Sequence, residues 1–355
     1  MTGPQHAAAP LELGDLDEEE ILARILPLLR PTQHDDPDAG PGRDRTEIVG
    51  PGDDAAVLAA PDRLIVTTDS MIRGRDWRDD WSSPRDVATK LGAQNISDIA
   101  AMGGTATGAV LTITAHAHTP FAWVAEFSEG LGQWCADAGV TIVGGDLSSA
   151  PEGVLQVSLT MWGTLEGRAP VLRSGARVGD VVAVCGSLGW SDAGLASYLA
   201  GEAEPEVGPG TPAPLRNTAV WRWFHRSPRP PWESGPVAAR AGATSMIDLS
   251  DGLVRDTARI ARASGVGMDL SREALARDFV SSFAEGRSSG QAWQHVLGGG
   301  EEHSLLATFP SATAVPRDEK APWWVIGSVV EGAGVTLDGE PVEMVGWDHF
   351  RTDRQ

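Results

Sequence analysis

Apolar residues recur along the chain at two spacings, one typical of helices and the other of strands. The helical spacing is seen in Ile21, Leu22, Ile25, Leu28 and Leu29, which follow an acidic stretch suited to a helix N-terminus. The same spacing predicts helices over 84–102, over 121–138 and from about 253 to 264. Short apolar runs predict strands at 55–58, 64–68, 110–114, 140–143, 155–165, 181–184, 246–247, 305–309 and 325–330. Because helices and strands alternate, the pattern predicts an α/β or α+β fold.

The chain is long enough to form two domains, since 355 residues exceed the size at which a single core usually stops growing. The composition changes near 166–168, and a turn at 175–180 leads into a new apolar strand. We therefore expect an N-terminal domain over 1–165 and a C-terminal domain over 166–355. The low-complexity stretch 201–214 predicts a surface loop. The Trp- and Pro-rich stretch 221–232 is either a substrate lid or a segment packed on its domain.

Charge and composition narrow the class of partner. The formal net charge of −21 argues against nucleic acid or an anionic membrane as a partner, because both require a basic surface. Lys90 and Lys320 are the only lysines, so arginine and metal ions are left to bind phosphate. Cys135 and Cys185 lie in apolar contexts typical of buried free thiols, which indicates a reducing cytoplasm. The first residues lack the pattern of a secretion signal, and no stretch approaches the roughly 20 apolar residues of a membrane span.

Aspartates stand beside glycines or hydroxyl residues at the predicted ends of apolar runs. They occur in PGDD (51–54), TTD (67–69), NISD (95–98), GGD (144–146) and DLSDG (248–252). Unpaired buried carboxylates are costly, so this pattern predicts cations between them. Oxygen-only donors, including the hydroxyls of Thr67, Thr68 and Ser250, favour Mg²⁺, which phosphate groups and water usually complete.

Two common phosphate-binding solutions are excluded by the sequence. No G-x-x-x-x-G-K-[ST] loop occurs, and the His-Arg-Asp and Asp-Phe-Gly motifs of protein kinases are absent. The remaining route is a ring of carboxylates holding several Mg²⁺ ions against a polyphosphate. Such a site works by positioning and charge neutralisation and needs no covalent intermediate.

Eight motifs in order identify a family. They are GPGDDAAVL, TTDSMIRGRDW, KLGAQNISDIAAMG, VGGDLSS, GRAPVLRSGARVGD, MIDLSDGL, GGGEEHSL and GWDHF, and the resemblance that they carry runs from about Leu16 to Phe350. This set resembles the thiamine-monophosphate kinases, which share a superfamily with aminoimidazole-ribonucleotide synthetase and selenophosphate synthetase. The resemblance implies two domains, each a mixed sheet covered by helices, with ATP in a cleft. It also implies a homodimer paired through its N-terminal domains, which transfers the ATP γ-phosphate to thiamine monophosphate in the last step of thiamine diphosphate biosynthesis.

The resemblance assigns roles residue by residue. The catalytic residues, which would act by holding metal ions, would be Asp54, Asp98, Asp146 and Asp248. The full magnesium set would be Asp54, Thr67, Thr68, Asp69, Asp98, Asp146, Asp248 and Asp251. The ATP contacts would be Gly145, Asp146, Arg173 and Ser250. The substrate contacts would be Asp76, Glu301 and Trp347, the tryptophan offering a stacking surface for a cationic heterocycle.

Two segments depart from the family pattern. Asp76 stands where many relatives have a histidine, and its carboxylate would either meet the substrate cation or repel the substrate phosphate. The usual Gly-Gly-Glu-Asp-Tyr-Glu is here GGEEHS (299–304). Two other functions therefore remain open: another ATP-using activity of the superfamily, or a non-catalytic nucleotide-binding protein. The selenium branch is disfavoured because no cysteine or lysine precedes Lys90.

Several of these residues have a purely structural alternative. Asp53 has a loop or capping role as its alternative to metal binding. Ser250 and Asp251 are suited to cap the following helix. Arg173 has an ion pair with Asp180 as its alternative, and Trp347 a packing role. We interpret His116, His118, His225 and His303 as structural or exposed, since their spacing does not suit a metal.

Overall fold

The computed structural model describes residues 10–30, 47–49, 57–59, 63–203, 208 and 211–346. The chain divides into two compact units. Unit 1 contains residues 1–60, 68–92 and 107–160, and unit 2 contains 61–67, 93–106 and 161–355. The domain boundary at 165/166 stays a prediction. No helix among the described residues is long and apolar enough to cross a membrane.

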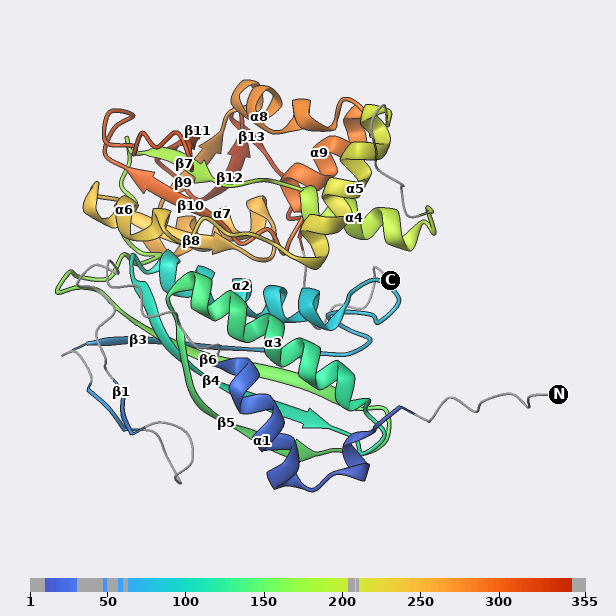
Figure 1. Cartoon of the computed structure of the whole chain (residues 1–355). Coiled ribbons are helices and arrows are strands. Elements are labelled where there is room, and N and C mark those ends of the chain that lie inside the picture. The colour runs from blue at the N-terminus through green and yellow to red at the C-terminus, as the bar shows by residue number, and fades with distance from the viewer. Residues whose placement is uncertain are drawn as a thin grey trace. The chain divides into compact units, whose positions relative to one another are not determined.

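The described helices and strands alternate along much of the chain (Figure 1). The helices are α1 (Glu18–Leu29), α2 (Pro84–Ala101), α3 (Phe121–Ala138), α4 (Trp190–Leu199), α5 (Ala213–Arg226), α6 (Ser234–Arg240), α7 (Leu253–Ser264), α8 (Arg272–Asp278) and α9 (Ser289–Gly298), with 3-10 turns η1 (Leu13–Asp15) and η2 (Val280–Phe283). The strands are β1 (Glu47–Val49), β2 (Val57–Leu58), β3 (Leu64–Ile72), β4 (Thr105–Ala115), β5 (Thr141–Ser149), β6 (Leu155–Thr164), β7 (Val181–Cys185), β8 (Ser245–Leu249), β9 (Gly267–Leu270), β10 (Ser304–Phe309), β11 (Trp323–Val330), β12 (Gly334–Leu337) and β13 (Glu340–Pro341).

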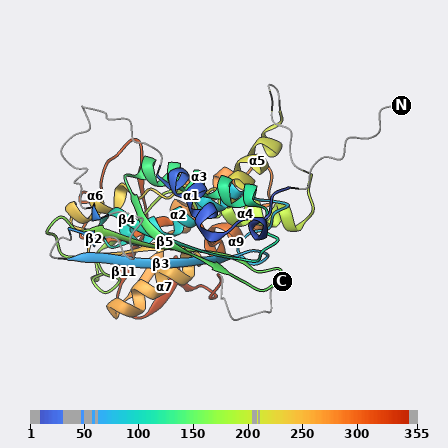
Figure 2. The same ribbon diagram turned by 60° about the horizontal axis from the view of Figure 1, so that its bottom comes forward.

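Unit 1 is built on a four-stranded sheet of order β3-β6-β4-β5, in which β4 and β5 run parallel. Alternate residues of β6 are buried, as the strand period of two requires, and the positions between them are half-buried. Helices α1 and α3 lie on one face of this sheet (Figures 1 and 2). Helix α1 begins with a capping box between Asp17 and Glu20. It approaches α3 so closely that a Cβ at Gly132 would lie 2.1 Å from the Leu28 carbonyl oxygen.

Unit 2 contains a seven-stranded mixed sheet of order β13-β12-β9-β11-β7-β10-β8. Strands β7 and β8 are buried along almost their whole length, so successive residues enter two different cores. Val182 and Ile247 belong to the core that includes residues of α7, α8 and α9. Ala183 and Met246 belong to the core that includes residues of α6 and the end of α2. Asp248 shares the strand face of Met246, because side chains two positions apart point the same way.

The predicted fold class is confirmed, because both units carry mixed sheets with helices. Most predicted elements are present, but β3 and β5 are longer than expected and run through the TTD and GGD motifs. The expectation that these motifs end their strands is therefore wrong. The packing alternative for the Trp-rich segment is right for Trp221, which is buried and stacks on Phe283 with ring centroids 5.2 Å apart.

The two cysteines are free and buried, as expected. Burial raises the pKa of the Cys135 thiol to about 12 and that of Cys185 to about 11. Neither thiol is therefore a nucleophile near neutral pH.

Candidate active site

The predicted site residues are distributed over both units. Those in unit 1 are Thr68, Asp69, Asp76, Gly145 and Asp146, and those in unit 2 are Thr67, Asp98, Arg173, Asp248, Ser250, Asp251 and Glu301. Asp54 and Trp347 lie outside the described residues, as does Asp53.

Thr67 of β3 and Asp98 of α2 are brought together in unit 2. The Thr67 hydroxyl donates a hydrogen bond of 2.5 Å to Asp98 Oδ2. Both residues are partly exposed, whereas the neighbouring Asn95 is fully buried. Two predicted magnesium ligands thus share one contact.

Asp248 lies in a buried cluster in unit 2. Ser97 of α2 donates a 3.1 Å hydrogen bond from its hydroxyl to Asp248 Oδ2. His303 Nδ1 lies 3.4 Å from the same carboxylate oxygen and 3.4 Å from Ser97 Oγ. His303 is buried, so the structural interpretation of this histidine is supported by its position. The cluster fixes the direction of Asp248 at the end of the edge strand β8.

The segment GEEH (300–303) turns sharply and is held to the end of β8. Glu301 and His303 both have left-handed backbone angles, with φ of 59° and 52°. Such angles cost a non-glycine residue on the order of 1 kcal/mol each, so surrounding contacts must hold them. Glu301 N donates to the Ser250 carbonyl oxygen at 2.8 Å, and His303 N donates to that of Leu249 at 2.9 Å. Glu301 therefore stands next to the predicted ATP contact Ser250.

Glu302 points into the interior of unit 2 and is fully buried. Its carboxylate accepts hydrogen bonds from Ser187 Oγ at 2.6 Å and from Ser191 N, in the first turn of α4, at 2.7 Å. Burial is the main cause that raises the pKa of Glu302 to about 7. The longer second acid of the GGEEHS segment thus anchors α4.

Asp251 is bonded by an arginine of the helix that follows it. Arg259 of α7 bonds both Asp251 and Asp256, the latter at 2.5 Å. Asp256 also accepts from the backbone N–H groups of Asp251 and Gly252, at 3.0 and 3.1 Å. The capping alternative for Ser250 and Asp251 is wrong, because Gly252 is the N-cap residue and Asp256 binds these N–H groups. Burial raises the pKa of Asp256 to about 7.

The GGD motif lies inside β5, beside its parallel neighbour β4. Gly145 pairs with Leu111, and a Cβ at Gly145 would lie 1.9 Å from the Leu111 carbonyl oxygen. Asp146 is exposed and accepts a 2.6 Å hydrogen bond from the Ser148 hydroxyl. Since β3 and β5 are the two edges of the four-stranded sheet, the strands that carry Asp69 and Asp146 are on the order of 14 Å apart across it.

Two further predicted residues have clear local roles. The Asp76 carboxylate accepts a 2.7 Å hydrogen bond from Ile72 N and so closes the turn after β3. Arg173 is exposed. Its proposed alternative partner, Asp180, is buried and accepts from Arg177 N at 3.0 Å and from Thr244 Oγ1 at 2.6 Å. Asp180 thus closes its own turn.

Magnesium is the metal that the family resemblance implies, and the donor chemistry fits it. The predicted ligands offer carboxylate and hydroxyl oxygens only, and Thr67 and Asp98 already meet. Within the described part of the chain, no group of three or more His, Cys, Asp or Glu side chains is arranged to hold a metal ion. A site there would therefore depend on phosphate and water oxygens for most of its coordination.

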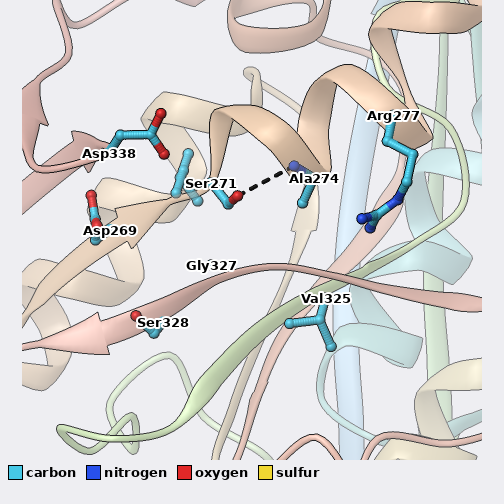
Figure 3. A pocket seen from close by; sticks show the side chains of 9 residues that line it. Asp269, Ser271, Ala274, Arg277, Val325, Gly327, Ser328 and Asp338 are labelled. Atoms are coloured by element: carbon cyan, nitrogen blue, oxygen red, sulfur yellow. Dashed lines mark hydrogen bonds between the residues drawn. The ribbon is translucent and has the colours of Figure 1, made fainter.

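A pocket of about 380 Å³ in unit 2 is lined by none of the predicted site residues. Figure 3 shows Asp269 and Asp338 on one side and Arg277 on another, with Val325 below. The polar groups bond to their own neighbours. Asp269 accepts from Thr336 and Gly339 N, Asp338 accepts from Arg272 N, and Arg277 pairs with Asp278. We assign no role in the candidate site to this pocket.

The sequence patterns missed several side chains that the fold brings to this region. His225 of α5 lies with its Nδ1 3.4 Å from Glu301 Oε2 and 3.0 Å from Ser191 Oγ. Helices α4 and α5 were not predicted, so their residues could not be placed. An apolar 3.6-residue period around Trp221 and Phe224 was the available signal.

Comparisons with known proteins agree with the motif resemblance. The model of the AIR synthase related protein N-terminal domain matches residues 52–165, and that of the C-terminal domain matches 177–340. Thiamine-monophosphate kinase of Mycobacterium tuberculosis is 44% identical over 309 residues, which are 86% of each chain.

Solved structures are similar over most of the chain. The crystal structure of thiamine-monophosphate kinase from Stenotrophomonas maltophilia covers 94% of this chain and 99% of that one, with a TM-score of 0.74 and 26% identity. A structure described as AaThiL complexed with AMPPCP and TMP covers 81% of this chain and 87% of that one, with a TM-score of 0.69 and 29% identity. Motif order, curated relatives and fold therefore agree: the chain belongs to the thiamine-monophosphate kinase family of AIR synthase related proteins.

Proposed function

We propose that this chain transfers the γ-phosphate of ATP to thiamine monophosphate, giving thiamine diphosphate and ADP. The observation that carries this function is 44% identity to a thiamine-monophosphate kinase over 86% of the chain. The similarity to a structure holding AMPPCP and TMP supports the same pair of substrates. The reaction would complete thiamine diphosphate biosynthesis.

The chemistry of the acceptor explains why no general base is required. The attacking group is a phosphate oxygen that is already anionic, so the protein needs only to align it with the ATP γ-phosphate and to neutralise charge. We assign Gly145, Asp146, Arg173 and Ser250 to ATP. We assign Asp76, Glu301 and Trp347 to thiamine monophosphate. The backbone hydrogen bond between Glu301 and Ser250 supports a fixed spacing of the two substrate sites.

We further propose that Mg²⁺ ions are held by Asp54, Thr67, Thr68, Asp69, Asp98, Asp146, Asp248 and Asp251. When bound, such ions neutralise the polyphosphate and orient its oxygens. Two contacts support the assignment: the Thr67–Asp98 hydrogen bond, and the Ser97 hydroxyl that holds Asp248 Oδ2. Asp251 would have to share its carboxylate with Arg259.

We also propose a homodimer that works in the cytoplasm. Exposed apolar side chains on β3 support the dimer. Leu64, Val66 and Ile72 are 46%, 61% and 41% exposed, an unusual amount of apolar surface on one strand. Hydroxyl pairs continue that surface, with Thr68 bonded to Thr160 and Ser70 to Ser158. Free buried cysteines are consistent with a reducing compartment.

The proposed function is tested by incubating the protein with ATP and Mg²⁺, adding thiamine monophosphate to one sample and thiamine to another. Chromatography should find thiamine diphosphate and ADP in the first sample only. ADP with no thiamine diphosphate would indicate another ATP-using activity of the superfamily. Binding of ATP without turnover would indicate a non-catalytic nucleotide-binding protein. Either result would overturn the proposal.

A further inference from the structure

Three consecutive side chains in the segment 301–303 contact three different parts of unit 2. Glu301 faces His225 of α5, Glu302 bonds Ser187 and the start of α4, and His303 faces Asp248. The left-handed angles at Glu301 and His303 produce this divergence. The segment is therefore a junction in which the direction of Glu301 depends on helix α5.

His225 is itself held in place. Its side chain is 8% exposed, whereas that of Glu301 is 34% exposed, so the histidine lies behind a carboxylate that reaches solvent. Ser191 Oγ lies 3.0 Å from His225 Nδ1, and Ser191 N donates to Glu302. The Tyr198 ring lies 6.2 Å from the imidazole, measured between centroids. Helices α4 and α5 thus fix the imidazole before any substrate binds.

The Glu301 carboxylate determines which tautomer of His225 is favourable. An ionised carboxylate only accepts hydrogen bonds, so Glu301 Oε2, 3.4 Å from His225 Nδ1, favours the tautomer that carries a proton on Nδ1. The serine hydroxyl accepts as readily as it donates, and it tolerates that tautomer. His225 therefore restrains one Glu301 oxygen from the protein side, while the Glu301 side chain as a whole is partly exposed.

We propose that His225 is a positioning residue that aims Glu301 at the amino-bearing heterocycle of the substrate and thereby sets selectivity for it. This inference rests on the proposed function, in which Glu301 contacts thiamine monophosphate. Thiamine carries an aminopyrimidine whose exocyclic N–H groups can donate to a carboxylate. A carboxylate held in one direction binds such a group without losing rotamer entropy at the moment of binding.

The test is a set of kinetic measurements on His225→Leu, His225→Asn and Glu301→Gln, with KM determined separately for thiamine monophosphate and ATP. His225→Leu should raise KM for thiamine monophosphate about 5- to 20-fold, the value of one polar contact to a partly exposed carboxylate. KM for ATP should change less than about twofold. Asparagine keeps an N–H donor near the Nδ1 position. His225→Asn should therefore leave KM for thiamine monophosphate close to that of the unmodified protein.

The double variant decides whether His225 acts through Glu301. In the Glu301→Gln background, His225→Leu should add less than about twofold, because the carboxylate that it positions is gone. His295→Leu is the matched control: His295 is also buried, and its Nδ1 lies 2.6 Å from the carboxylate of Asp192 instead of that of Glu301. It should lower the melting temperature without a selective change in KM.

Three results would overturn the inference. The effects of His225→Leu and Glu301→Gln on KM for thiamine monophosphate could multiply fully in the double variant, or His225→Leu could raise the KM values for both substrates equally. The third is a KM for thiamine monophosphate in His225→Asn as high as that in His225→Leu. The proposed function is judged separately, from the unmodified protein. If the unmodified protein makes thiamine diphosphate and the variants behave multiplicatively, only the positioning role fails. If it makes none, the proposed function itself fails.

Discussion

The packing of Gly145 against β4 allows a sharp test of the sheet that carries the GGD motif. A Cβ at position 145 would lie 1.9 Å from the Leu111 carbonyl oxygen and 3.0 Å from the Leu111 carbonyl carbon. The first distance is about 1.5 Å short of an ordinary contact, and both atoms belong to backbone, which cannot rotate away. Gly145→Ala must therefore push β4 and β5 apart.

The expected loss of stability follows from the backbone hydrogen bonds between β4 and β5. Separating the strands by more than 1 Å weakens about two hydrogen bonds, each of net value about 1 kcal/mol, and adds strain. We expect a loss of about 3 kcal/mol in the free energy of unfolding, which lowers the melting temperature on the order of 5–10 °C. Thermal unfolding followed by circular dichroism measures this directly.

The neighbouring glycine provides the control. At Gly144 the nearest atom to an added Cβ is Val110 Cγ1 at 4.0 Å, an ordinary contact. Gly144→Ala should therefore melt within about 2 °C of the unmodified protein, since it also reduces the freedom of the unfolded chain. Equal melting temperatures for the two variants, or a Gly145→Ala protein as stable as the original, would refute the packing argument.

Three other perturbations have definite expected outcomes. The folded protein keeps a proton on Glu302 between pH 4.5 and about 7, where the unfolded chain has released it, so stability from this group falls as pH rises through that window. In Glu302→Gln the free energy of unfolding should decline by about 3 kcal/mol less over this pH range, as measured by urea unfolding at several pH values. An unchanged dependence of that free energy on pH would contradict the prediction. Arg222 is buried and donates to Ser197 Oγ and to the Glu202 carbonyl oxygen, so Arg222→Leu should cost about 2–4 kcal/mol in urea unfolding, and a loss below about 1 kcal/mol would contradict this. Asp146 is exposed, so Asp146→Asn should lower kcat at least about 100-fold with an unchanged melting temperature, and intact ATP turnover would contradict its metal role.

The sequence predicted the elements whose pattern is local. The apolar spacing in α1, α2, α3 and α7 is regular, and these helices were found near their observed ends. The TTD and GGD motifs were placed at strand ends because a carboxylate rarely continues an apolar run. In the structure the strands continue, since alternate positions on β3 and β5 are partly exposed and accept polar side chains.

The remaining contacts depend on tertiary structure. Nothing local signals that Thr67 meets Asp98, or that Ser97 and His303 hold Asp248, because these residues are 31 to 206 positions apart. Glu302 resembled a lengthened site residue, yet its burial makes it an anchor for α4. The spacing of His225 does not suit a metal and so predicts a structural or exposed role, and no local signal places helix α5, which brings this histidine to Glu301.

Phosphorus NMR of one reaction mixture tests the central claim most directly. The protein is mixed with ATP, Mg²⁺ and thiamine monophosphate, and the signals of both substrates are followed with time. The account predicts that the monophosphate signal is replaced by the two coupled signals of thiamine diphosphate, while ADP forms in equal amount. Formation of ADP with inorganic phosphate, and an unchanged thiamine monophosphate signal, would contradict direct transfer between the two phosphates.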